Sequence, residues 1–167
     1  MQEIEVKILE INKAELIKKL ENLWAEMIFD SYIDAEFFMS QNQKKLRLRK
    51  TKYWNYMTMK EKIQKDWYKI NQEHELEFGD YETFEKILIL SWFQKFWTSK
   101  KQRISYKLWN IVFDFDSIKD IPDFVEVESD NIADVEKWVE ILGYNMSQTN
   151  TFWEKELKEF YWIKWGI

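Results

Sequence analysis

Most of this chain alternates polar and apolar residues one by one, and this two-residue period is the feature that most constrains its fold. Successive side chains of a β-strand point to opposite faces, so the period predicts strands with one polar and one apolar face. Eight segments follow the pattern, at residues 3–8, 31–38, 45–49, 56–62, 73–78, 103–108, 111–115 and 124–128. Their number and their short links predict antiparallel pairing.

Four other segments have the apolar spacing of amphipathic helices. The first follows Asn12, which can cap it together with Glu15, and the others cover about 81–96, 132–142 and 151–161. Gly143 follows the third helix, at a position that suits a left-handed C-terminal residue. The order of elements predicts an α+β fold. We expect an antiparallel eight-stranded closed β-barrel with helices packed outside, in a single domain over residues 1–167.

Charges on the polar faces are segregated by sign, strand by strand. Antiparallel sheets are commonly wet on one face, so a sandwich with solvated charged faces is one reading of this pattern. The apolar faces suit the amphipathic helices, however, and a barrel covered by helices turns the charged faces inward. An interior lined by both signs would be unstable as a dry core. The pattern therefore favours a wet tunnel that binds a polyanion and a metal ion.

Composition restricts the chemistry of such a tunnel. The 167 residues include no cysteine and one histidine, so a metal ion would need carboxylate ligands, which suit Mg²⁺, Mn²⁺ or Ca²⁺. The net charge of −5 argues against a nucleic-acid partner. The sequence begins MQEIEVK, without a signal peptide, and contains no apolar run of membrane-spanning length, so a cytoplasmic protein without a membrane partner is expected.

The segment E-I-E-V-K at residues 3–7 resembles the ExExK signature of the CYTH superfamily. That group includes class IV adenylate cyclases, thiamine triphosphatases and bacterial inorganic triphosphatases. The resemblance covers nearly the whole chain, because further segments follow in the family's order: L-R-L-R (46–49), T-M-K (58–60), E-L-E (75–77), R-I-S-Y (103–106), F-D-F-D (113–116) and F-V-E-V-E (124–128).

The resemblance implies roles for these residues. A Mg²⁺ or Mn²⁺ ion would be bound by Glu3, Glu5, Asp116, Glu126 and Glu128. A triphosphate-containing small molecule would be bound by Lys7, Arg47, Arg49, Lys60, Lys101 and Arg103. Lys60 and Arg103 are the expected catalytic cations, while Glu75 and Glu77 would hold basic residues in place. Asp114 is a further candidate acid on the metal side. The resemblance is also compatible with a homodimer.

The activity itself stays open at this point. Hydrolysis of inorganic, nucleoside or thiamine triphosphate is favoured, because it needs no base-specific pocket and the sequence shows no adenine-recognition motif. Cyclisation of ATP to cyclic AMP by an adenylate cyclase is the alternative, and a non-catalytic polyphosphate- or nucleotide-binding module is another. Charge spacing does not distinguish them.

Tryptophan is abundant and glycine is scarce, with 10 and 3 residues. Average usage would give roughly 12 glycines. Several tryptophans stand where glycine is favoured: Trp24 after the first helix, and Trp54-Asn55 and Trp109-Asn110 between strands, with Asp66-Trp67 at a turn. Packing or an interface could also require tryptophan. Our hypothesis is that several of these codons are UGA triplets that the source organism reads as glycine, with Trp138, inside a helix, as an exception.

Overall fold

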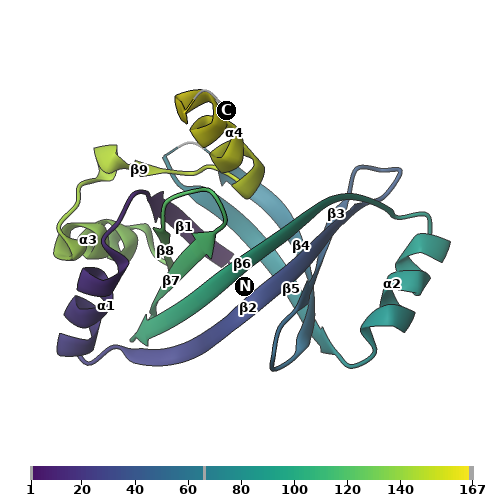
Figure 1. Cartoon of the computed structure of the whole chain (residues 1–167), viewed down its shortest axis with the longest axis horizontal. Helices are drawn as coiled ribbons and strands as arrows, with labels where there is room; N and C mark the ends of the chain where they lie inside the picture. The colour runs from purple at the N-terminus through teal and green to yellow at the C-terminus, as the bar shows by residue number, and fades with distance from the viewer. Residues whose placement is uncertain (1, 66, 166–167) are drawn as a thin grey trace.

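The computed structural model describes residues 2–65 and 67–165 and contains a closed antiparallel β-barrel (Figure 1). Its eight strands are β1 Gln2–Ile8, β2 Glu26–Met39, β3 Lys45–Lys50, β4 Asn55–Lys65, β5 Lys69–Phe78, β6 Gln94–Leu108, β7 Ile111–Ile118 and β8 Phe124–Ser129. They follow the order β5-β4-β3-β2-β6-β7-β8-β1, and β1 pairs with β5 to close the ring. A short strand, β9 Thr149–Asn150, pairs beside β1. The predicted fold class is confirmed.

The helices are α1 Lys13–Asn22, α2 Tyr81–Leu90, α3 Ile132–Leu142 and α4 Glu154–Trp165, with a 3₁₀ turn at Met146–Gln148. The Asn12 side chain accepts a hydrogen bond from the backbone N–H of Glu15, as the capping pattern predicted. Gly143 ends α3 with a φ of +100°. None of the helices in the described part of the chain is both long and apolar enough to cross a bilayer.

The main hydrophobic core lies outside the barrel, between the outer face of the sheet and two helices. Val6 of β1, Phe113 of β7 and Val127 of β8 are fully buried against a cluster that includes Leu20 of α1 and Val139 of α3. At the other end of the molecule, α2 packs on β2 and β3 through a smaller cluster (Figure 1). Because the apolar faces are covered from outside, the alternate polar side chains face the interior.

Helix α4 covers one end of the barrel. Its Leu157 and Tyr161 are fully buried in a cluster at the end of β7 and the start of β8. At the start of the helix, the Ser99 hydroxyl of β6 donates to Glu154, at 2.5 Å. The preceding Trp153 ring lies 4.3 Å from the Lys45 ammonium of β3. These contacts reach strands on different sides of the ring, so the helix closes this end.

Several predicted boundaries differ from the structure. Helix α2 ends at Leu90 rather than near residue 96, since Trp92 takes a left-handed conformation and β6 begins at Gln94. Trp54-Asn55 was expected to lie between two strands, but only Trp54 does: the loop spans residues 51–54, and Asn55 already pairs with Lys50. Strand β5 begins four residues earlier than predicted. Of the expected Asp66-Trp67 turn, Asp66 lies outside the described residues.

Candidate functional site

The structure brings the predicted site residues together inside the barrel. Strand pairing sets Lys7 opposite Glu126, Glu5 opposite Glu128 and Lys60 opposite Glu73. Glu5 and Lys7 are 2% and 3% exposed, which is rare for charged residues and requires that they be paired. The Lys7 ammonium lies 2.7 Å from Glu126 and 3.2 Å from Glu5. The interior is thus a network of buried ion pairs.

The order of the strands separates the interior into two opposed walls. In a ring of eight, each strand faces the fourth one along, so β3 faces β8 and β4 faces β7. Strand β3 carries Arg47 and Arg49, while β8 carries Glu126 and Glu128. Lys60 of β4 therefore faces β7, which carries two aspartates. A ligand between these walls would contact cations on one side and carboxylates on the other.

On the acidic side, Arg103 of β6 holds three carboxylates at once. Its Nε donates to Asp116 at 2.7 Å, and its Nη2 donates to Asp116 at 2.6 Å and to Glu126 at 2.5 Å. Its Nη1 donates to Asp114, which also accepts from the Ser105 hydroxyl. Burial by itself lowers the pKa of Arg103, but the carboxylates outweigh it and raise that pKa. Arg103 therefore remains charged and fixes the positions of its partners.

Two groups of carboxylates have a geometry that could hold a cation. They are Glu3, Glu5 and Glu128, and Asp114, Glu126 and Glu128, with the ligand oxygens of each group within 4.8 Å of one another. Glu128 belongs to both groups and forms no ion pair with any described residue. Asp116, expected as a metal ligand, lies outside both groups and is bound by Lys101 and Arg103.

Electrostatics in the first group fit a cation. Burial raises the pKa of Glu3 to about 7, although Lys60, at 2.8 Å, acts in the opposite direction. Burial, with Asp114 and Glu3 nearby, also raises the pKa of Glu128. Burial would raise the pKa of Glu5 too, but Lys7 and Lys69 outweigh it and lower that pKa. Crowded oxygen donors of this kind suit Mg²⁺ or Mn²⁺.

The cationic wall has donors without acceptors. Within the described residues, the Nε atoms of Arg47 and Arg49 are buried and have no hydrogen-bond partner. Arg47 forms no ion pair there, whereas Arg49 donates through Nη2 to Thr58, at 3.2 Å, and to Glu75. Burial, with Arg47 close by, lowers the pKa of Arg49 to about 10. An anion between these two guanidinium groups would satisfy both donors.

The interior is more exposed at one end than at the other. The side chains of Glu75 and Lys60 are 37% and 25% exposed, whereas that of Asp116 is fully buried. The exposed end is the one away from α4, where β1 and β4 start and β8 ends. A ligand would therefore reach the site from this end.

Sequence reasoning missed two interior residues of β5. Lys69 is 9% exposed and bonds to Glu5, and Asn71, opposite Glu3, is 2% exposed. Both share the parity of Glu73, so continuing the alternation four residues upstream would have found them. Glu75 binds Arg49, consistent with its expected supporting role, whereas Glu77 is exposed.

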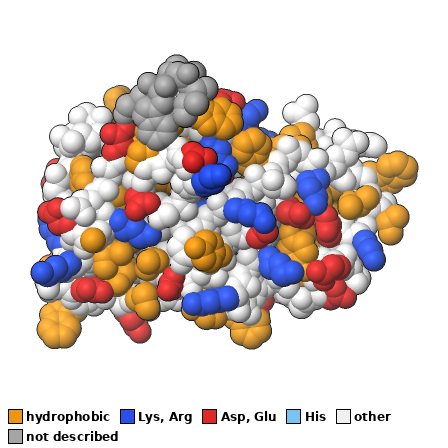
Figure 2. Space-filling view, in the orientation of Figure 1, with side chains coloured by type: hydrophobic (Ala, Val, Ile, Leu, Met, Phe, Trp, Pro, Cys, Tyr) orange, Lys and Arg blue, Asp and Glu red, His pale blue; other side chains and the backbone are white. Residues whose placement is uncertain are grey.

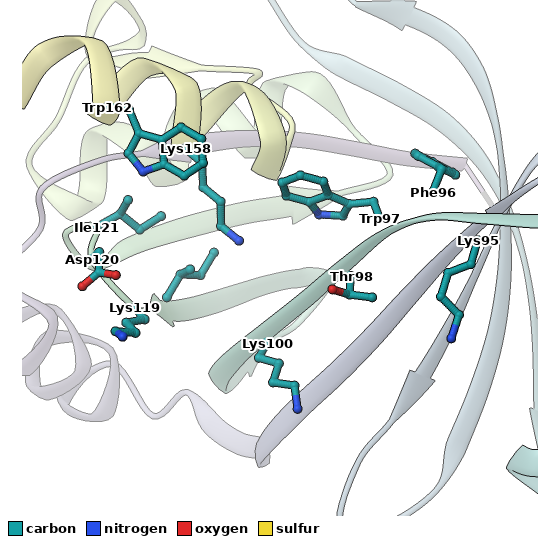
Figure 3. A pocket seen from close by; sticks show the side chains of 11 residues that line it. Lys95, Phe96, Trp97, Thr98, Lys100, Lys119, Asp120, Ile121, Lys158 and Trp162 are labelled. Atoms are coloured by element: carbon teal, nitrogen blue, oxygen red, sulfur yellow. The ribbon is translucent and has the colours of Figure 1, made fainter. Parts of the chain in front are cut away.

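A second pocket, of about 650 Å³, lies outside the barrel between β6, the turn after β7 and α4 (Figure 3). Trp97, Lys158 and Trp162 are among the side chains that line it. Three of its four lysines already have partners: Lys158 lies 3.1 Å from Glu154, Lys100 lies 2.9 Å from Asp34, and Lys95 lies 2.8 Å from Glu36. Both signs of charge are interspersed over this face of the molecule (Figure 2). The barrel interior, where arginine donors have no partner among the described residues, is therefore the better candidate for an anion site.

Solved structures resemble this chain over most of its length. A protein from Pyrococcus horikoshii OT3 matches with a TM-score of 0.81 and 25% identity, covering 93% of this chain and 98% of that one. A candidate adenylate cyclase from Vibrio parahaemolyticus matches with a TM-score of 0.81 and 13% identity, covering 94% and 97%. A candidate adenylyl cyclase from Hippeastrum, reported to have a dominant triphosphatase activity, matches with a TM-score of 0.60 and 12% identity, covering 83% and 84%.

No curated protein matches the chain. The family model of the CYTH domain, in contrast, matches residues 1–152, which is nearly the whole sequence. This match agrees with the closed barrel and with the ordered motifs that line it. The chain therefore belongs to the CYTH domain family.

Proposed function

We propose that this protein is a metal-dependent triphosphatase that hydrolyses an inorganic, nucleoside or thiamine triphosphate inside the barrel. The observation that carries the proposal is the pair of walls: β3 carries Arg47 and Arg49 donors that have no partner among the described residues, and it faces β8, where Glu128 has no ion pair among them. CYTH proteins generally process triphosphates, which supports the same conclusion. An anion and a cation bound together would satisfy both walls.

The basic residues would bind the triphosphate. Arg47 and Arg49 can each present a planar fork to phosphate oxygens, while Lys60 acts as a point charge beside Glu3. Lys7, Lys101 and Arg103 already bind carboxylates, so they would share these contacts with the substrate. We assign Lys60 and Arg103 to stabilising the charge that develops on the transferred phosphoryl group, because phosphoryl transfer depends mainly on positioning and electrostatics.

The acidic residues would hold the metal ion. Glu3, Glu5 and Glu128 form one carboxylate group, and Asp114 and Glu126 form a second group with Glu128. A bound Mg²⁺ or Mn²⁺ would neutralise phosphate charge and polarise the phosphoryl oxygens. Asp116 would fix Lys101 and Arg103 at the edge of this site.

Product analysis tests the proposal directly. Tripolyphosphate, ATP and thiamine triphosphate are each incubated with the protein and Mg²⁺ or Mn²⁺, and release of phosphate and of cyclic AMP is measured. Phosphate release is expected, and it should be lost in Glu128→Gln but retained in Glu77→Gln, which changes an exposed carboxylate of β5. Cyclic AMP as the main product from ATP would indicate a cyclase instead. Binding without turnover would indicate a binding module. A result with no binding and no product would contradict all three functions.

A further inference from the structure

Three tryptophans occupy backbone positions that normally belong to glycine. Trp24 and Trp92 both have a φ of 66°, and Trp109 has a φ of 55°. Among the described residues, six other than glycine have a positive φ, and these tryptophans are half of them. The left-handed region is disfavoured for residues with a Cβ atom, and a bulky aromatic residue there is an outlier. The local folds around these residues therefore need an explanation.

The first two positions repeat the helix ending made by Gly143. At that glycine, Gly143 N–H donates to Glu140 and the next N–H donates to Val139. The same two bonds recur at Trp24, whose N–H donates to Glu21 while the next N–H donates to Leu20. Trp92 closes α2 with the same i−3 and i−5 pattern. This is the Schellman motif, whose left-handed residue is usually glycine.

The third position is a tight hairpin. Leu108 of β6 pairs with Ile111 of β7, so Trp109 and Asn110 form a two-residue loop. Of these two loop residues, Trp109 alone has a positive φ. A two-residue loop with positive φ at its first position is typical of the type II′ turn, which takes glycine there.

The side chains at these positions contribute little packing. Trp24, Trp92 and Trp109 are 89%, 74% and 75% exposed, whereas Trp138 of α3 is 4% exposed. Trp109 does meet the edge of the Trp138 ring, at 6.2 Å between centroids. An exposed tryptophan on strained backbone stabilises the fold neither by packing nor by its backbone preference, so selection for folding would not favour it.

We propose that positions 24, 92 and 109 are glycine in the protein as its source organism makes it. Their codons would be UGA triplets, which the organism reads as glycine. Translation with a genetic code in which UGA specifies tryptophan would give Trp at these positions. The geometry carries this inference independently of any activity, because it rests on backbone conformation and hydrogen bonds at three separate turns. Trp138, buried within a helix, is assigned as a genuine tryptophan.

The gene and the native protein provide the first test. We expect UGA codons at 24, 92 and 109 and UGG at 138, with peptides from the source organism carrying glycine at the first three positions by mass spectrometry. UGG codons at those three positions, or tryptophan in the native peptides, would overturn the proposal.

Stability provides a second test that does not need the source organism. In the recombinant chain, Trp24→Gly and Trp92→Gly should each raise the midpoint of thermal unfolding by about 2–4 °C. Trp24→Ala is the matched control: it removes the ring but keeps a Cβ atom at positive φ, so it should bring little gain. Trp138→Gly should lower the midpoint. Equal midpoints for the glycine and alanine variants at position 24 would contradict the strain argument.

A different observation identifies a further ligand-binding residue, and this second inference rests on the proposed function. Asn71 of β5 is 2% exposed, and its side-chain Nδ2 is buried without a hydrogen-bond partner among the described residues. Its Cα pairs with that of Glu3, and it lies between Lys69 and Glu73 on the inner face. We infer that Asn71 donates to an oxygen of the bound triphosphate.

The variant Asn71→Leu separates this role from a structural one. Leucine has a similar size but no donor, so triphosphate binding should weaken by about tenfold while thermal stability is kept or raised. The probe is tripolyphosphate with Mg²⁺, measured by calorimetry, with His74→Leu on the exposed face of the same strand as the control. Unchanged affinity, or affinity and stability lost together, would overturn the assignment. If the unmodified protein fails to bind tripolyphosphate, the proposed function is contradicted, and the role inferred for Asn71 is contradicted with it.

Discussion

At the scale of single residues, the arginines of β3 distinguish a binding site from a structural ion-pair network. Lys7 and Arg103 are matched by carboxylates, whereas the Nε atoms of Arg47 and Arg49 are buried without partners in the described residues. Buried donors without acceptors are costly. An anion bound at these adjacent inward positions would satisfy both donors, which is why we propose the anion site there.

Replacing either arginine should weaken triphosphate binding. In Arg47→Ala, loss of charge-assisted hydrogen bonds to phosphate is expected to raise the Kd for tripolyphosphate by roughly 10- to 100-fold. Isothermal titration calorimetry would measure it. The matched control is Lys50→Ala, which removes an exposed cation from the same strand. Equal losses in both variants would show that overall charge, rather than the inner face of β3, governs affinity.

Stability of the metal-free protein should depend on the protonation of Glu3. Its pKa is about 7 in the folded state against 4.5 ordinarily, so between these values the folded protein holds a proton that the unfolded chain has released. Stability is therefore highest below pH 4.5 with respect to this group and falls as the pH rises toward 7. Thermal unfolding in a chelator should show this decline. Glu3→Gln should flatten it, and an unchanged slope in that variant would exclude Glu3 as the cause.

The alternation of the sequence predicted which side chains face inward, because the face of a strand is fixed by parity. It did not predict their partners. Lys101 and Arg103 hold Asp116, whereas Glu128 has no ion pair in the described residues. This difference follows from the register between β6, β7 and β8. Register is set by the whole barrel and cannot be read from one strand.

At the scale of elements, weakening the packing of α4 tests whether this helix covers one end of the barrel. Leu157→Ala would leave a cavity among Ile118, Phe124 and Tyr161, all of which are buried. A fully buried leucine typically contributes about 2–5 kcal/mol. Chemical denaturation should show a loss in that range. A change below about 1 kcal/mol would indicate that α4 is not firmly packed on the barrel.

Local signals located the centres of the elements but not all of their ends. α1 and α3 agree with prediction because caps mark them: Asn12 at the start of α1, and Asn131 and Gly143 around α3. α2 was predicted too long, because a tryptophan rather than a glycine stands at its left-handed end. β2 and β6 extend well beyond the predicted segments, since they are held by 13 cross-strand partner pairs that no local pattern reveals.

At the scale of the whole molecule, ligand and metal should stabilise the barrel together. Binding of both would offset the repulsion between like charges on each wall with attraction to the bound ions. A ligand at 100 times its Kd adds about 2.7 kcal/mol of stability. For a chain of this size that corresponds to a rise of roughly 5–10 °C in Tm. Differential scanning calorimetry with Mg²⁺ and tripolyphosphate should show this rise in the unmodified protein. Glu128→Gln should lose most of the part that depends on Mg²⁺, and a rise that is independent of Mg²⁺ would argue against a metal at this site.

Because α4 covers one end of the barrel, we expect a ligand to enter and leave through the opposite end. Such a site can receive the free end of a phosphate chain but cannot let a chain thread through. We therefore expect the protein to release phosphate from linear tripolyphosphate and to leave cyclic trimetaphosphate, which has no free end, intact. Long polyphosphates would be shortened from their termini rather than cut in the middle. A barrel that is open at one end would therefore be selective for the ends of phosphate chains.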